Sequence, residues 1–421
     1  MANGRVTFID VLRVREFRAL WAADAQSMAG DQLARVALSV LVFERTASSV
    51  LTALTYALTF LPGLLGGALL SGLADRYPHR RVLIACDVLR AAVLLTMVIP
   101  GMPIGWLAVL VVVSVLIGSP FAAAELALIP ELLDGERYVV ATGLRNITNQ
   151  VAQLVGFALG GMVIAAIGPR AGLAVDAASF AVSAGVIWAG VRPRPSAKAR
   201  PGLSAVPSAT GYLPAVFAGF ALIARDRGLR TRLGLIWLMG LWVVPEGVAP
   251  PYAVDIGGGT RAVGFLMAAA PAGMILGAYF FVRVVGDRLR SRLLGPVAVL
   301  TGAPLVLCAL QPGLGLSILL WGLSGVLMAY SVPLQADFVR AVPRDQRGQV
   351  VGIGASGLLA VQGVGILLGG LIAQGWNAAT AITVAGGLGA ALAAWFAMGL
   401  AWASRPVEQT GPAPEGATET I

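Results

Sequence analysis

Apolar segments of about twenty residues recur along almost the whole chain, and they constrain its fold more than any other feature. Residues 106–128, for example, read "WLAVLVVVSVLIGSPFAAAELAL". A helix of about 20 apolar residues crosses the roughly 30 Å hydrocarbon core of a bilayer. Of the 421 residues, 57% are hydrophobic and only 12% are charged, whereas soluble domains carry about 25% charged residues. The sequence therefore predicts an all-α membrane protein.

We expect twelve transmembrane helices, divided into two halves of six. The apolar segments lie at 18–43, 48–72, 82–101, 104–128, 141–167, 170–190, 232–254, 260–283, 293–311, 313–337, 349–374 and 376–403. The expected domains are an N-terminal six-helix bundle (1–190), a cytoplasmic linker with an interfacial helix (191–231), a C-terminal six-helix bundle (232–403) and a disordered tail (404–421).

The arginines favour one side of the predicted membrane. The formal net charge of +9 does not indicate nucleic-acid binding, because the excess lies in short loops between apolar segments. The loops on the basic side carry Arg13, Arg15, Arg18, Arg76, Arg80, Arg81, Arg192, Arg194, Lys198, Arg200, Arg288, Arg290, Arg292, Arg340, Arg344 and Arg347. Cytoplasmic loops of membrane proteins are enriched in Lys and Arg. We therefore expect both termini to be cytoplasmic, in a plasma-membrane protein without a cleaved signal peptide.

Residues that carry cofactor or enzyme chemistry are scarce. The chain has two cysteines and one histidine, so neither a disulfide framework nor a histidine-rich metal site is expected. Glycine-rich stretches such as "GVGILLGG" lie inside apolar helices, where they do not form phosphate-binding loops. We predict no cofactor, no metal and no enzymatic activity.

The two halves contain an internal repeat. The loop "GLADRYPHRR" (72–81) corresponds to "VVGDRLRSRL" (284–293), and "GFALGG" (156–161) corresponds to "GILLGG" (365–370). The matched positions are Asp75 with Asp287, Arg76 with Arg288, Arg80 with Arg292, Gly156 with Gly365, Gly160 with Gly369, and Gly161 with Gly370. Parallel repeats of this kind are typical of transporters whose substrate site lies between the halves.

At these residues the sequence resembles the major facilitator superfamily. The loop "GLADRYPHRR" resembles the loop signature of that family, and "GDQLARVAL" in the first segment resembles its drug and siderophore exporters. The fifth segment follows the spacing of the family's antiporter motif, with Ala152 and Phe157 as departures, at Gly143, Ala152, Gly156, Phe157, Gly160 and Gly161. Close packing of small residues explains these glycines at least as well as a role in coupling. The fourth segment lacks the arginine that the family often uses for proton coupling.

The resemblance implies gating by the repeated loops. The gating residues are Gly72, Asp75, Arg76, Arg80, Asp287 and Arg288. Gly72 would permit close helix approach, and Asp75 would accept bonds from a neighbouring helix on the cytoplasmic side. The arginines equally serve as topology anchors.

The first segment carries three charges where lipid-facing residues are expected. Asp24, Asp31 and Arg35 fall within roughly 40° on one helical face. A charge at mid-span costs about 2.5–3.5 kcal/mol on insertion scales, so this face must line a polar cavity or contact other helices. Because Arg35 is one turn from Asp31, a fixed intrahelical ion pair is slightly favoured over a functional role for Asp31.

The seventh segment holds a second buried acid, Glu246, in "LWVVPEGVAPPY" (241–252). Glu246 has no cation in its own helix, which makes it the better candidate for proton coupling or for binding a cationic substrate. Trp242 on the same face would add a cation–π contact, or would simply contribute to packing. Nearby prolines, among them Pro245, Pro250 and Pro251, should bend the helix.

Amide side chains are weaker site candidates, and two further acids are expected at the interface. The amides are Asn149, Gln150, Gln153 and Gln362, which either line a cavity or bond to neighbouring helices. Asp176 and Asp255 are expected to be interfacial, near the outer ends of their segments.

The favoured function is proton-coupled efflux of small lipophilic compounds by a monomer in the lipid bilayer. Export of a siderophore or another anion, with Arg35 in the site, is the first alternative. A proton-coupled importer and a non-transporting membrane scaffold also remain open.

Overall fold

In the computed structural model, every described segment of regular structure is helical. The structure describes residues 6–70, 72–194, 209–344 and 346–403, and no strand occurs within these ranges. The tail 404–421 and most of the linker between 191 and 208 lie outside them. The helices of the first half are α1 (Phe8–Leu12), α2 (Arg15–Thr46), α3 (Ser49–Ala57), α4 (Leu61–Leu70), α5 (Gly72–Arg76), α6 (His79–Met97), α7 (Ile104–Leu132), α8 (Glu136–Ile167) and α9 (Pro169–Gly190). After the linker follow α10 (Ala209–Arg225), α11 (Arg227–Trp237), α12 (Met239–Trp242), α13 (Val244–Gly247), α14 (Ala249–Asp255), α15 (Thr260–Arg283), α16 (Asp287–Leu300), α17 (Ala303–Val306), η2 (Leu307–Leu310), α18 (Leu314–Met328), α19 (Ser331–Ala341), α20 (Arg347–Gly375) and α21 (Ala378–Ala403).

Most of the long helices are apolar enough to span a membrane, but two long helices are not. Within the described residues, nine helical stretches are long and apolar enough to span a bilayer, or ten if a bent pair is counted as one span. The helices α2 and α6 are not among them. Both are long, but α2 carries Asp24, Asp31 and Arg35, and α6 carries Asp87 and Arg90. These two helices therefore carry five charged side chains in their middle parts.

The seventh apolar segment is broken, as its prolines predict. It is divided into α11, α12, α13 and α14, and its two main parts meet at an angle of 51°. Pro245 lies in the first turn of α13, and Pro250 lies in the first turn of α14. Since proline lacks an N–H donor and clashes with the preceding turn, it begins a helix more readily than it continues one. The break places Glu246 in a four-residue helix at the centre of the segment.

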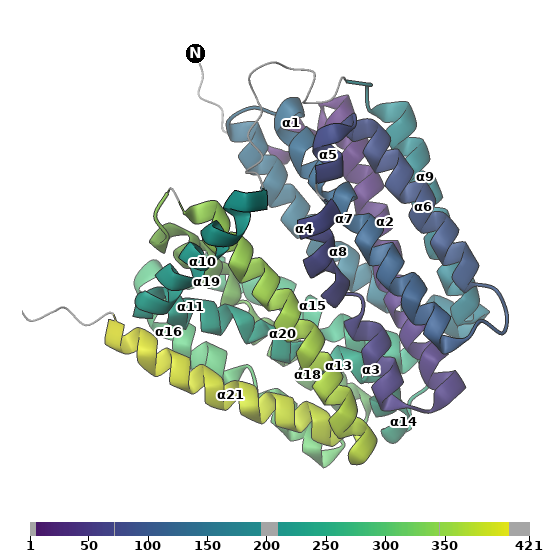
Figure 1. Ribbon diagram of the computed structural model, residues 1–421. Helices are drawn as coiled ribbons and strands as arrows, with labels where there is room; N and C mark the ends of the chain where they lie inside the picture. The colour runs from purple at the N-terminus through teal and green to yellow at the C-terminus, as the bar shows by residue number, and fades with distance from the viewer. Residues whose placement is uncertain (1–5, 71, 195–208, 345, 404–421) are drawn as a thin grey trace, which may run out of the picture.

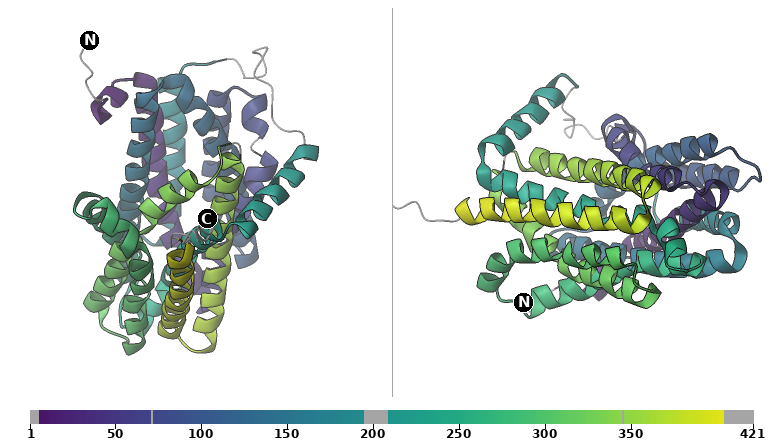
Figure 2. Two further views of the ribbon diagram at one scale, coloured as in Figure 1. Left: turned by 90° about the vertical axis from the view of Figure 1, so that its left-hand side faces the viewer. Right: turned by 90° about the horizontal axis from the view of Figure 1, so that it is seen from below.

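The chain is arranged as two groups of helices that meet along part of their length. Helices α2 to α9 lie together, and helices α11 to α21 form a separate group in all three ribbon views (Figures 1 and 2). In Figure 1 the groups meet near α3, α13 and α20 and diverge toward α5 and α10. The contacts between them include α8 with α15 and α3 with α20.

Glycines allow the two groups to approach closely, and they do so in equivalent ways. A Cβ added at Gly161 of α8 would lie 2.6 Å from the Cα of Gly264 in α15, while one at Gly370 of α20 would collide with Ala53 of α3. Each of these two glycines therefore contacts the opposite group. Gly160, one residue before Gly161, instead faces Leu33 of α2 within its own group.

The second half repeats this arrangement, because the glycine that precedes Gly370 also faces a helix of its own group. A Cβ at Gly369 would collide with Val244 of α13, which belongs to its own group. The pair Gly160 and Gly161 and the pair Gly369 and Gly370 thus make equivalent contacts. The close-packing interpretation of these glycines is confirmed, whereas Gly143 faces open space.

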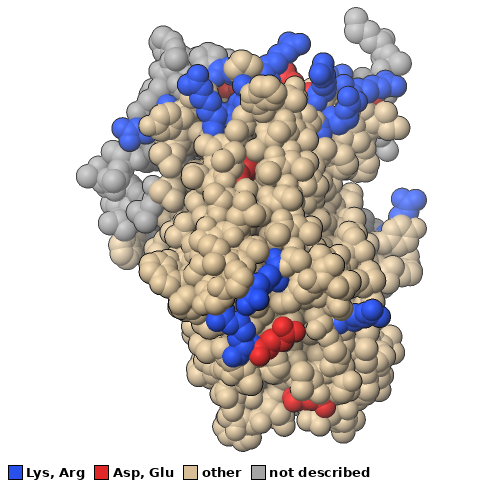
Figure 3. Space-filling model, turned by 90° about the vertical axis from the view of Figure 1, so that its right-hand side faces the viewer, with Lys and Arg blue, Asp and Glu red and all other residues tan. Residues whose placement is uncertain are grey.

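Charges are distributed unevenly over the surface. On the face shown in Figure 3, Lys and Arg gather at the upper end, a belt almost free of charge lies below them, and a second group of basic and acidic residues lies in the lower half. The upper end is the end of the first half that carries α1 and α5 (Figure 1). We use the term arginine-rich end for the helix ends that carry the loop arginines. In the first half it comprises the ends at α1 and α5, and in the second half it comprises the ends at α10, α16 and α19.

Candidate functional site

Among the described residues, five acidic side chains and three arginines lie inside the first group of helices. They come from all of its long helices, and α2, which packs against α8 and α9, contributes three of the eight. The acids are Asp24, Asp31, Asp87, Glu125 and Asp176, and the arginines are Arg35, Arg90 and Arg145. We call this set the charged core.

Arg90 of α6 is the ion-pair partner of Asp31. Its Nη2 lies 2.7 Å from Oδ1 of Asp31, and its guanidinium carbon lies 4.0 Å from the centroid of the Phe180 ring. The expected pair between Asp31 and Arg35 within α2 is wrong. A contact between two helices replaces it, because α6 brings a cation to the face on which Asp31 projects.

A second ion pair lies about two turns nearer the arginine-rich end. The Nη2 of Arg145 in α8 lies 2.6 Å from Oε2 of Glu125 in α7 and 3.7 Å from Oδ2 of Asp24. The side chain of Glu125 is only 4% exposed. Glu125 and Arg145, which interrupt two apolar segments of the sequence, therefore stabilise each other's charge.

The other two acids of the charged core have serine partners instead of arginine partners. Asp87 of α6 accepts a hydrogen bond from the Ser183 hydroxyl at 2.5 Å, and Asp176 of α9 accepts one from Ser179 at 3.0 Å. Both acids are fully buried. Their remaining carboxyl oxygens, Oδ1 of Asp87 and Oδ2 of Asp176, have no hydrogen-bond partner among the described residues. The expected interfacial position of Asp176 is wrong, whereas Asp255 is exposed at the end of α14 as expected.

A cavity of about 200 Å³ opens beside these residues within the first half. Asp31, Arg35, Arg90 and Asp176 supply its charged lining, and Ser114 of α7 adds a hydroxyl. Polar cavities of this size hold several ordered waters. The cavity thus brings together two acids and two arginines from three helices.

Arg35 links the charged core to the second half of the molecule. Its guanidinium carbon lies 4.7 Å from the centroid of Phe60, and it interacts electrostatically with Tyr56 and Glu246. The hydroxyl of Tyr56 in α3 donates to Oε2 of Glu246 in α13 at 2.5 Å. Glu246 is buried, as expected. This hydrogen bond joins the two halves at the centre of the molecule.

Trp242 and the amides lie apart from this bond. Trp242 is 3% exposed and faces Gly389 of α21 inside the second half. Gln150, Gln153 and Gln362 are half-buried and Asn149 is exposed. In the described ranges, no hydrogen bond connects these four amides to the charged core.

The repeated loops lie at the arginine-rich end. Arg80 donates to the carbonyl of Trp188 at the end of α9, at 2.5 Å, and Arg76 is exposed. Gly72 does not mediate a close helix contact, because the space around it is open, so that expectation is wrong. The backbone of Asp75 lies in α5 and that of Asp287 and Arg288 begins α16, while the side chains of these three residues lie outside the described part of the structure.

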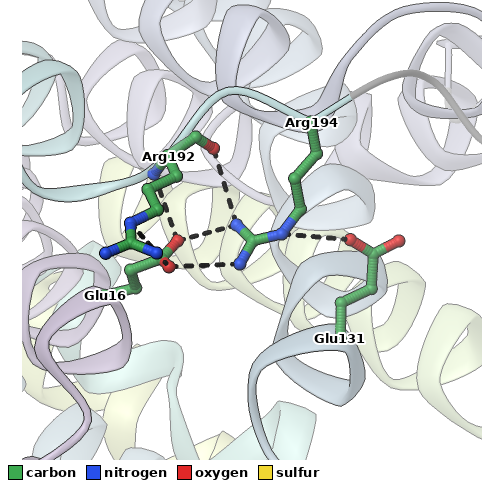
Figure 4. Close-up of polar contacts among 4 residues, drawn as sticks. All are labelled: Glu16, Glu131, Arg192 and Arg194. Carbon is green, nitrogen blue, oxygen red and sulfur yellow. Dashed lines mark hydrogen bonds and ion pairs between the residues drawn. The ribbon is translucent and has the colours of Figure 1, made fainter.

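A polar cluster that the sequence did not reveal fixes the segment after α9 to the first half (Figure 4). Glu16 at the start of α2 accepts from Nη1 of Arg194 at 2.7 Å and from the backbone N–H of Arg192 at 3.1 Å. Arg194 also approaches Glu131 of α7. Burial alone raises the pKa of Glu16, but the hydrogen bonds from Arg194 and Arg192 outweigh it, and the pKa is lowered from its ordinary value.

Two helical groups, glycine contacts between them and a charged core at membrane depth define a polytopic membrane transporter. A family model described as "Major Facilitator Superfamily" matches residues 20–255. The chain belongs to the major facilitator superfamily.

Similar proteins agree with this assignment. The multidrug efflux pump Tap of Mycobacterium tuberculosis is 27% identical over 368 residues, which cover 83% of this chain and 84% of that protein. Macrolide efflux protein A of Streptococcus pyogenes is 22% identical over 372 residues, covering 85% and 89%.

Solved structures share the fold at lower identity. The nucleoside transporter NupG superposes with a TM-score of 0.67 at 14% identity, covering 92% of this chain and 98% of that chain. A POT family transporter in complex with 5-aminolevulinic acid gives 0.71 at 10% identity, covering 93% and 97%.

Proposed function

We propose that this protein exports small lipophilic compounds across the plasma membrane in exchange for protons, by alternating access between its two halves. The two relatives described above are named efflux pumps, which supports export. The observation that carries the proton coupling is the charge balance of the charged core.

The charged core holds two more acids than arginines. Burying a charge without a partner costs several kcal/mol, and a buried group avoids this cost by becoming neutral. Two of the five acids should therefore carry a proton while the site is empty. Asp87 and Asp176 are the candidates, since arginines lie beside the other three. Release of these protons when a cationic compound enters would keep the charge balanced.

Glu246 is the proposed link between charge and movement. Its hydrogen bond from Tyr56 crosses from one half to the other, so the bond must break if the halves separate at this point. A proton on Glu246, or a cation beside it, changes the strength of that bond. Protonation and conformational change would thus be coupled at one contact.

The proposed function also requires a membrane topology in which both halves span the bilayer. We propose that α2 and α6 also span the membrane, giving twelve spans in two pseudo-symmetric six-helix bundles, with 191–231 as a cytoplasmic linker. The insertion cost of their charges is offset because those charges face the charged core rather than lipid. The arginine-rich end is cytoplasmic by the positive-inside rule, and the protein acts as a monomer.

Transport by reconstituted protein tests the coupling, with ethidium as the probe cation. An acidic liposome interior should drive ethidium accumulation through the wild type, and Glu246→Gln should abolish this drive. Glu44→Gln, at an exposed acid near the end of α2, is the matched control and should transport normally. Proton-driven transport that persists in Glu246→Gln would remove Glu246 from the mechanism, and a wild type indifferent to the pH gradient would refute proton coupling.

A second candidate function is export of an anion, because Arg35 lies over the Phe60 ring and, although it interacts electrostatically with Glu246, no carboxylate of the described residues lies within ion-pair distance of it. Such an arginine would bind a carboxylate or phosphate of the substrate. Arg35→Ala should then abolish export of anions while sparing ethidium. Equal loss of both would count against this alternative.

A further inference from the structure

An apolar groove lies outside the charged core, between α10, α11 and α21 at the arginine-rich end of the second half. Its volume is about 530 Å³, within the usual range of ligand sites. The lining includes Phe220 of α10, Trp237 of α11, and Trp395 and Phe396 of α21. Trp395 is 65% exposed and Phe220 is 48% exposed. The groove is thus a hollow, open to its surroundings, with large aromatic side chains in its walls.

The floor of the groove is formed by close contact of α11 with α21. A Cβ at Gly234 would collide with the ring of Phe396, and one at Gly399 would lie 2.6 Å from Cγ2 of Thr231. Trp395 stacks on Phe396 with ring centroids 5.5 Å apart. Because α11 and α21 are held together here, the hollow lies beside their contact, where α10 diverges from α21 as the ribbon views show (Figure 2).

Arginines border one end of the groove. Arg227 and Arg230 line it, and Arg225 is exposed at the junction of α10 and α11. The one acid among them, Asp226, accepts from the backbone N–H of Leu229 at 2.9 Å and caps α11. Among the described residues, Arg230 donates one hydrogen bond, to the carbonyl of Ala224 at 2.9 Å. A guanidinium has five N–H donors, so Arg230 retains donors for a ligand.

We propose that this groove binds one anionic phospholipid, with its acyl chains along the aromatic walls and its phosphate at Arg227 and Arg230. An apolar hollow that ends in a cluster of positive charge matches an amphiphile whose headgroup is negative. The proposed membrane position agrees, because the arginine-rich end would lie at headgroup depth and Trp395 and Phe396 of the apolar helix α21 line the groove. Each Lys or Arg near an anionic leaflet strengthens such binding.

The bound lipid would connect the linker helix to the second half. Phe220 belongs to α10, and Trp395 belongs to the last helix of the molecule. A chain lying between them buries the exposed faces of both and holds α10 against α21. The anionic lipid content of the membrane would therefore affect how firmly the linker is anchored.

Native mass spectrometry of the purified full chain tests the lipid site. Phosphatidylglycerol and phosphatidylcholine with identical chains serve as probes. The wild type should retain one phosphatidylglycerol with about tenfold preference, equivalent to about 1.4 kcal/mol. Arg227→Gln combined with Arg230→Gln should abolish the preference, and Arg344→Gln, at an exposed arginine beyond the groove, should keep it.

Several outcomes would overturn the assignment. Equal retention of the two lipids by the wild type would exclude a site that prefers an anionic phospholipid. This outcome is read from the wild type alone and does not depend on how any variant folds. A preference that survives in the double variant, or that Arg344→Gln removes equally, excludes Arg227 and Arg230 as the headgroup site. Displacement of the lipid by ethidium would assign the groove to the transported compound instead.

Discussion

At the scale of residues, the buried acids fall into two kinds. Glu125 has an arginine at ion-pair distance, whereas Asp87 has the hydroxyl of Ser183. A carboxylate beside a guanidinium remains charged, but one beside a hydroxyl is stable in an apolar interior only when it is neutral. Substitution by the isosteric amide therefore separates the two kinds.

Glu125→Gln should destabilise the protein far more than Asp87→Asn. Among the described residues, loss of the Glu125 charge leaves Arg145 with only the longer ion-pair contact to Asp24, and breaking a buried pair costs about 3–5 kcal/mol. Asp87→Asn removes no ion pair and should cost less than about 1 kcal/mol. Thermal unfolding of the detergent-purified variants measures the difference. Equal loss of stability would mean that Asp87 is charged and paired in the folded protein.

The Glu16 cluster predicts a pH dependence outside the membrane. Because the pKa of Glu16 is lowered in the folded protein, its stabilising effect is present above the unfolded pKa of about 4.3. The effect is lost as the pH falls through the lower folded value. Glu16→Gln should therefore reduce stability by about 1 kcal/mol at pH 7 and at pH 5, and the difference should shrink below about pH 4.

Thermal unfolding of wild type and Glu16→Gln across this range provides the measurement. A difference that disappears already between pH 7 and pH 5 would contradict a lowered pKa for Glu16.

At this scale the sequence predicted which residues are unusual better than it predicted their partners. Asp31, Arg35 and Glu246 stand out because charges are rare in apolar segments. The partner of Asp31 could not be read from helical spacing, since Arg90 reaches it from another helix. Asp176 was misplaced because distance from a segment end gives depth, but not which neighbour covers the residue.

At the scale of elements, α2 shows how a helix with too many charges can lie at the centre of a membrane protein. Its charged face meets α6, α7 and α8, so the ion pairs replace the water that these charges lose. Hydropathy predicted α15 at 260–283 as the structure has it. It missed the breaks within the second segment, where α3 ends and α4 begins.

Glycine contacts between α8 and α15 give a prediction for closure of the halves. Gly161→Ala should force these helices apart, since the added Cβ would lie 2.6 Å from the Cα of Gly264. Gly143→Ala is the matched control on the same helix, with open space around it. Spin labels on α8 and α15 near this contact should report a longer distance for Gly161→Ala. Unchanged distances would show that the contact does not hold the halves together.

At the scale of the whole molecule, the two halves are joined away from the arginine-rich end. The cross-half hydrogen bonds among described residues are those of Gln374 with Ser48 and Ser49, and that of Tyr56 with Glu246. The sequence repeat anticipated the equivalent glycine contacts, because close backbone approach requires glycine in both halves. It could not indicate which end is closed, since either conformation uses the same sequence.

The central claim is that the empty transporter holds protons on Asp87 and Asp176, and infrared spectroscopy tests it most directly. Protonated carboxyl groups absorb apart from carboxylates, so the purified wild type should show a protonated-carboxyl band at neutral pH. The band should decrease in Asp87→Asn combined with Asp176→Asn and persist in Glu44→Gln. A wild type without the band, or a double variant with an undiminished band, would contradict the account.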